Sequence, residues 1–163
     1  MPGIKSLGRL EKMIERLVRQ LDLTGTTISG NKLKIETIQA AKVLTASDSG
    51  KIFQVNNSAA SITLPATPEQ GMHFKFVNFA DGITVIGGLI FGSALLLQDG
   101  GDTAVHFETA AANNKISLNG STTGGTAIGD FVEMTCLDAD ADSWYVRVVA
   151  AATGTEATPF STV

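Results

Sequence analysis

Three aspartates in the stretch LDADADSW have the spacing of a calcium-binding loop. Asp138, Asp140 and Asp142 would occupy the first, third and fifth positions of an EF-hand loop. However, Ser143 stands where that loop needs glycine, and Val149 stands where it needs a bidentate glutamate. The sequence therefore favours a solvated turn of a β-hairpin, with calcium binding as the alternative.

Other residues with metal-binding or redox chemistry are few and isolated. His73 and His106 are the only histidines, and each alternates with apolar neighbours in a way that places it on the solvent side of a strand. Two histidines without a third ligand make a poor metal site. Cys136 is the only cysteine and falls in the middle of a predicted strand, which indicates a buried thiol, no disulfide and folding in a reducing cytoplasm. We therefore expect no metal and no cofactor.

Catalytic motifs are missing from the sequence. There is no Gly-x-Ser-x-Gly nucleophile motif, and the glycine-rich stretch GGTAIG lies among strands rather than before a helix, where a phosphate loop would be. The sequence predicts that the chain is not an enzyme. The alternative is a glycan-cleaving pair of carboxylates in a groove between subunits.

The elements that position these residues are predicted to be short strands separated by glycine and asparagine turns. Their spacing indicates a β-sandwich or β-barrel over residues 43–150, with Trp144 in the core and Tyr145 exposed. Residues 151–163 are small and polar, which predicts an extended or loosely ordered tail. The expected strands lie near residues 43–45, 51–55, 61–64, 72–78, 83–86, 89–97, 103–107, 115–118, 130–137 and 143–150.

The stretch 82–97 carries no charge, but it is unsuited to crossing a membrane as a helix. Four glycines interrupt it, and it is shorter than the ~20 residues that a spanning helix needs. We expect two buried strands around Gly87 and Gly88, with a membrane-inserting segment as the alternative. The amphipathic N-terminus also lacks the apolar core of a signal peptide.

Residues 1–24 have the pattern of an oligomerisation helix. Their apolar positions form a heptad seam, and Ile4, Met13 and Val18 widen it, which favours three helices over two. A lone helix of this length is marginal, so partners must bury the seam. Residues 25–42 are predicted to form a small β-hairpin connector. Alternatively, the helix folds back on its own β-domain or docks on another protein. The seam consists of Leu7, Leu10, Ile14, Leu17 and Leu21.

Charge is distributed unevenly along the chain. Residues 1–42 hold eight Lys/Arg and four Asp/Glu, a net charge of +4, whereas the remainder has a net charge of −8. Such an asymmetry suits docking of the N-terminal segment on an acidic protein surface, steered by Arg9, Arg16 and Arg19. A solvated helix face is the alternative. The basic residues lack interleaved aromatics, which argues against nucleic acid as the partner.

Two segments resemble proteins of tailed-phage virions. The stretch KVLTASDSGKIFQVNNSAASITLP (residues 42–65) with GMHFKFVN (residues 71–78), and the closing hairpin GDFVEMTCLDADADSWYVRV (residues 129–148), are similar to head decoration (cement) proteins and parts of tail fibres. The resemblance implies a homotrimer that binds the major capsid protein on the outer capsid surface and is assembled in the host cytoplasm. The alternative is a short trimeric fibre knob that recognises a host surface glycan. No functional residue is transferred from the family, because the shared pattern marks turns and core.

Overall fold

The computed structural model describes residues 32–98 and 103–163, and residues Leu33–Val163 form one compact unit. The predicted helix over residues 1–24 lies outside the described residues. The same holds for its seam residues and for Arg9, Arg16 and Arg19. In the part of the chain that the structure describes, no helix is long and apolar enough to cross a membrane.

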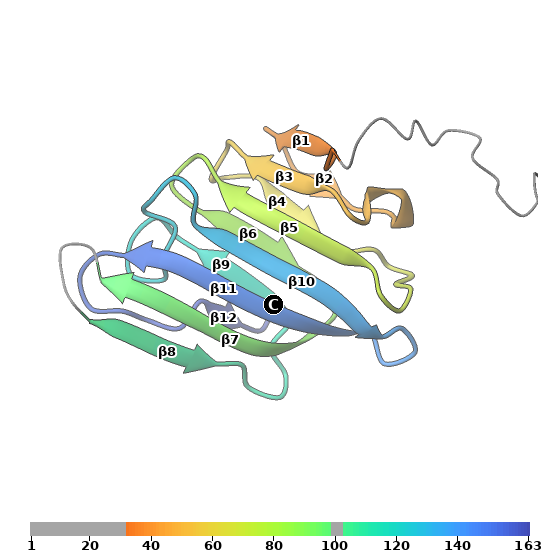
Figure 1. Cartoon of the computed structure of the whole chain (residues 1–163). Helices are drawn as coiled ribbons and strands as arrows, with labels where there is room; N and C mark the ends of the chain where they lie inside the picture. The colour runs from red at the N-terminus through yellow and green to blue at the C-terminus, as the bar shows by residue number, and fades with distance from the viewer. Residues whose placement is uncertain (1–31, 99–102) are drawn as a thin grey trace, which may run out of the picture. The chain divides into compact units, whose positions relative to one another are not determined.

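Two β-sheets pack face to face, as the predicted mainly-β sandwich requires (Figure 1). The seven-stranded sheet has the order β1(Ile35–Ile38), β3(Ile52–Val55), β5(His73–Asn78), β10(Phe131–Asp138), β11(Ser143–Ala152), β7(Leu89–Gln98) and β8(Ala104–Glu108). The five-stranded sheet has the order β12(Phe160–Ser161), β9(Lys115–Leu118), β6(Ile83–Ile86), β4(Ser61–Thr63) and β2(Lys42–Val43). A short 3₁₀ helix, η1(Ala46–Asp48), follows β2.

The first six strands wind as a flattened coil. Successive strands alternate between the sheets, so that β1, β3 and β5 pair in parallel in one sheet, and β2, β4 and β6 pair in parallel in the other. The second half of the chain adds β10 and β11 as an antiparallel hairpin beside β5, and β7 then pairs in parallel with β11. Non-local pairing of this kind cannot be read from local turn signals.

The core is formed by the inward residues of both sheets. Trp144 stacks on Phe74 with ring centroids 5.7 Å apart, and Phe53 stacks on Phe76 at 5.6 Å. Strict alternation along β5, β10 and β11 supplies these side chains, since every second residue of a strand faces the same way. Isoleucines of the other sheet complete the core from the opposite side: Ile62, Ile83 and Ile116.

Two segments pair with strands that the sequence did not predict as their partners. Residues 35–38, assigned to the hairpin connector, form a strand whose described partner is β3, in parallel; the first half of the predicted hairpin lies outside the described residues. The tail, expected to be extended or loosely ordered, includes a short extended strand: Phe160 is buried and β12 pairs with β9. Backbone hydrogen bonds from Thr153 to Ser121 and from Ala157 to Thr122 hold the segment that leads to β12.

The uncharged stretch 82–97 forms the two strands that we expected. Gly87 and Gly88, both with positive φ, join β6 of one sheet to β7 of the other. Positive φ is accessible to glycine at little cost, and this permits the sharp change of sheet.

Candidate interaction surface

Strand β7 is apolar on both of its faces. Its inward residues Ile90, Ala94 and Leu96 are buried in the core. Apart from Ser93, its outward residues are apolar too, yet they remain exposed: Leu89 39%, Phe91 43%, Leu95 38% and Leu97 44%. A continuous apolar run is typical of a strand that is covered on both faces. The described residues bury only the inward side chains of β7.

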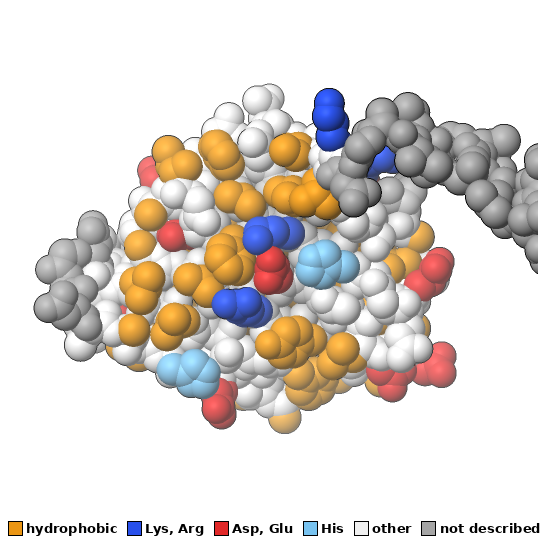
Figure 2. Space-filling model, in the orientation of Figure 1, with side chains coloured by type: hydrophobic (Ala, Val, Ile, Leu, Met, Phe, Trp, Pro, Cys, Tyr) orange, Lys and Arg blue, Asp and Glu red, His pale blue; other side chains and the backbone are white. Residues whose placement is uncertain are grey.

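Neighbouring strands extend the apolar surface. Tyr145 of β11, 46% exposed, lies directly beside Phe91 in the register, and Val149 lies beside Leu95. Phe131 of β10 is paired with Val149 in turn. Figure 2 shows this outer face of the seven-stranded sheet, on which hydrophobic side chains surround a small group of charged ones.

The charged group forms one row across the sheet. Lys75 Nζ donates to Glu133 Oε1 at 2.9 Å, and the register continues from Glu133 to Arg147. Lys75 Nζ also lies 4.5 Å from the centre of the Phe131 ring, and Arg147 Cζ lies 6.0 Å from it. The hydrogen bond from Lys75 holds the pKa of the Glu133 carboxyl below its usual value. Beyond Arg147 the row passes through Ser93 to Glu108.

Both histidines lie on this outer face, as their alternation predicted. His73 Nδ1 and Thr135 Oγ1 are 3.0 Å apart in a hydrogen bond, and His73, Thr135, Tyr145 and Phe91 follow one another across the register. His106 lies beside Leu95 on β8. The two histidines lie in different rows of the sheet.

The three aspartates form the hairpin turn between β10 and β11. Asp138 Oδ1 accepts from the backbone N–H of Asp140 at 3.0 Å and of Ala141 at 3.2 Å. Asp142, with φ of 46°, accepts from Trp144 Nε1 at 2.9 Å. Two of the three carboxylates thus accept hydrogen bonds from the hairpin itself, and one of them fixes the core tryptophan.

Cys136 is buried in the core of this hairpin, as predicted. Burial raises the pKa of its thiol, and the nearby carboxylates of Asp142 and Asp138 raise it further. Because the thiolate is the reactive form, this environment makes the thiol a poor nucleophile.

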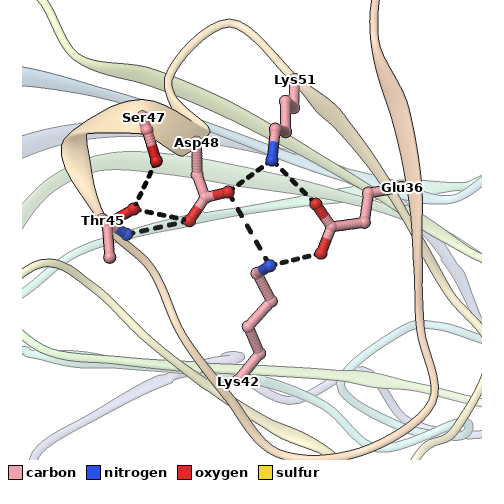
Figure 3. A network of polar contacts seen from close by, with 6 residues as sticks. All are labelled: Glu36, Lys42, Thr45, Ser47, Asp48 and Lys51. Carbon is pink, nitrogen blue, oxygen red and sulfur yellow. Dashed lines mark hydrogen bonds and ion pairs between the residues drawn. The ribbon is translucent and has the colours of Figure 1, made fainter.

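The Thr-Ala-x-Asp-Ser-Gly-Lys stretch forms a polar network at the start of the sandwich (Figure 3). Asp48 accepts from the backbone N–H and the hydroxyl of Thr45, each at 3.0 Å. Lys51 Nζ donates to Asp48 at 2.6 Å and to Glu36 at 2.9 Å. Lys42 forms an ion pair with Glu36 and lies 3.8 Å from Asp48. Strands β1 and β2 and the η1 turn are thereby joined.

Opposing effects set the protonation of this network. Burial raises the pKa of Asp48, but the hydrogen bonds from Lys51 and Thr45 outweigh it, so that the pKa lies below its usual value. Hydrogen bonds from Lys42 and Lys51 lower the pKa of Glu36. The two lysines thus neutralise the two carboxylates, which indicates a structural role for the network. The sequence showed a turn here, but Glu36 is too distant along the chain for its part to be read from spacing.

Among the described residues, no three His, Cys, Asp or Glu side chains converge as metal ligands would. No family model matches the chain, and no curated protein matches it. The exposed apolar side chains on the outer face of the seven-stranded sheet make that face the candidate interaction surface.

Proposed function

We propose that this chain is a structural decoration protein of a phage capsid, a homotrimer that binds and stabilises the outer surface of the head. The observation that carries the proposal is the exposed apolar face centred on β7 and β11. Apolar side chains gathered on one sheet face mark protein contacts more often than chemistry. The resemblance of residues 42–65, 71–78 and 129–148 to virion proteins supports the same class.

In this proposal, the helical seam joins three chains and the basic N-terminal segment meets the shell. Leu7, Ile14 and Leu21 would occupy one core position of the bundle, and Leu10 and Leu17 the other. Arg9, Arg16 and Arg19 would steer the trimer toward acidic patches of the major capsid protein. The proposed function includes no catalytic step, cofactor or nucleic acid.

A fibre knob that binds a host glycan is the second candidate. The observation that favours it is the adjacent exposed pair Tyr145 and Phe91, with His73 and Thr135 in the same row. Aromatic rings beside hydrogen-bonding groups suit the apolar and polar faces of a sugar. The two candidate functions are distinguished by measuring whether the chain binds capsids or host glycans.

The test is re-addition of purified protein to capsids that lack it. We expect saturable binding that weakens from low to high salt, because screening shortens from ~10 Å at 0.1 M to ~3 Å at 1 M. A variant with Arg9, Arg16 and Arg19 all changed to serine should bind more weakly at low salt and show little salt dependence. A variant with Lys32 and Lys34 changed to serine is the control for lost positive charge. Failure of the wild type to bind capsids at any salt would refute the proposed function.

A further inference from the structure

Apart from Ser93, the outward side chains of β7 are apolar, and they lie in one line near one edge of the seven-stranded sheet. Only β8 separates this line from the edge, and β8 itself presents Ala104, His106 and Glu108 outward. The most apolar strand on the face is thus not at the middle of the sheet. A partner that covers the face must centre on β7 if it is to bury Phe91, Leu95 and Leu97 together.

The charges that flank this line are complementary to each other. In the row Arg147–Ser93–Glu108, Arg147 lies one strand to one side of β7 and Glu108 one strand to the other, about 4.8 Å away in each direction. Neither side chain has an ion-pair partner among the described residues, whereas Lys75 and Glu133 on the same row are paired. Among the described residues, one cation and one anion without ion-pair partners therefore lie on opposite sides of β7.

We propose that this face binds a second copy of the same chain, with a two-fold axis running along β7. Rotation about that axis places β7 on β7 and β11 of each copy over β8 of the other. Arg147 of each copy then faces Glu108 of the other, Ser93 faces Ser93, and the apolar line packs against itself. In an isologous contact, the same patch of both copies forms the interface, so the patch must be complementary to itself.

The overlap is small and makes the contact weak. With β8 at the edge, only β11, β7 and β8 overlap, a strip of roughly 15 Å by 30 Å, or roughly 450 Å² per copy. Stable interfaces bury about 800 Å² per partner, so an isolated pair associates weakly. Copies that are already held together or aligned on a surface gain avidity from such contacts.

This inference goes beyond the proposed function, because it rests on the described β-domain alone. A two-fold contact joins chains in pairs, whereas the helical seam would join them in threes. The sheet contact would therefore connect different trimers. Its test does not depend on whether the seam or the capsid site exists.

The first test is crosslinking of the full chain through Ser93, which lies on the proposed axis. Ser93→Cys, treated at high protein concentration with a short bismaleimide, should give a covalent dimer. The wild type, whose thiol is the buried Cys136, should give none. Ser117→Cys, on the five-stranded sheet, is the matched control and should give far less dimer. Equal yields from the two serine variants would overturn the proposal.

The second test reverses the charges in the Ser93→Cys background. Arg147→Glu or Glu108→Arg alone brings like charges together and should lower the dimer yield several-fold. The double reversal restores opposite charges and should return the yield toward that of Ser93→Cys. Circular dichroism verifies that each variant is folded. Yields unchanged by the single reversals, or not restored by the double one, contradict the proposed axis.

Discussion

At the residue scale, the carboxylates of this chain serve the fold. Asp48 and Glu36 hold two strands and a turn together through Lys42 and Lys51, and Asp142 orients Trp144. The stretch from Thr45 to Lys51 therefore forms a turn in which partly buried charges compensate one another. Such a network is costly to break on one side, because the opposite charges are left without partners.

Acid should weaken this network and the separate ion pair of Lys75 with Glu133. The pKa values of Glu36, Asp48 and Glu133 are lowered in the folded chain, so the unfolded chain binds more protons as the pH falls. Their stabilisation is present above the unfolded pKa values near ~4 and is lost as the pH falls through the lower folded values. Asp130, whose pKa burial raises, acts in the opposite sense.

We expect Asp48→Asn to lower the free energy of unfolding by about 1–2 kcal/mol near neutral pH. The difference from the wild type should shrink as the pH is lowered below ~4, because the native carboxylate becomes protonated. Urea unfolding of both proteins across this pH range measures it. Glu69→Gln, at an exposed position without an ion pair to a described residue, is the control. If the difference in the free energy of unfolding between Asp48→Asn and the wild type did not change with pH, this result would contradict the assignment of a charged carboxylate to Asp48.

At the element scale, two features contribute to the stability of the fold. The first is the position at which β7 requires glycine, and the second is the residue that anchors the C-terminal tail. Gly92 in β7 has a φ of +153°, and a Cβ there would lie 1.8 Å from the backbone oxygen of Val146. Gly71 also has positive φ, but no atom lies within 4 Å of its Cβ position. Substitutions at these two glycines therefore distinguish the effect of steric crowding from that of backbone strain.

Gly92→Ala should therefore destabilise the fold by at least about 3 kcal/mol, since β7 and β11 must separate to admit the methyl group. Gly71→Ala, which adds strain alone, should cost about 1 kcal/mol. Thermal unfolding of the two variants compares them. Equal losses of stability would contradict the close pairing of β7 with β11.

Phe160 provides the second element-scale prediction. We expect Phe160→Ala to lower the free energy of unfolding by about 3–5 kcal/mol, because a large buried side chain is removed from the core. Phe79→Ala, at an exposed position, should cost less than ~1 kcal/mol. Denaturant unfolding measures both. A loose tail would instead make Phe160→Ala as mild as Phe79→Ala.

The sequence predicted the strands better than their partners. Alternation in HFKFVN and SWYVRV correctly indicated which side chains face the core, because successive side chains of a strand point to opposite faces of the sheet. It could not reveal that β1, β3 and β5 are parallel, because this pairing joins distant segments. The apolar run of β7 predicted a buried strand, yet the described residues bury only its inward side chains. The composition of the tail predicted an extended or loosely ordered segment, but it did not predict that β12 pairs with β9 and that Phe160 is buried.

At the scale of the whole molecule, the proposed assembly has two kinds of contact. The seam of the N-terminal segment would join three chains, and the β7 face would join chains in pairs. The first depends on residues outside the described part of the chain, and the second on residues within it. Variants can therefore remove either contact without the other.

We expect Ile14→Asp to convert the trimer into monomers and dimers, because a buried charge in the seam costs several kcal/mol per chain. Lys12→Asp introduces the same side chain on the side of the predicted helix that faces away from the seam. This variant should remain trimeric. Sedimentation equilibrium at micromolar concentration distinguishes the species. A wild type that sediments as a monomer would refute the seam.

The copy number of the chain in purified virus particles tests the central claim most directly. Quantitative mass spectrometry gives the ratio of this chain to the major capsid protein. A decoration protein occupies the whole shell, so we predict a fixed ratio of the same order as one chain per capsid subunit. A chain that is absent from the particles, or present only in the few copies that a single tail or fibre needs, would contradict the account.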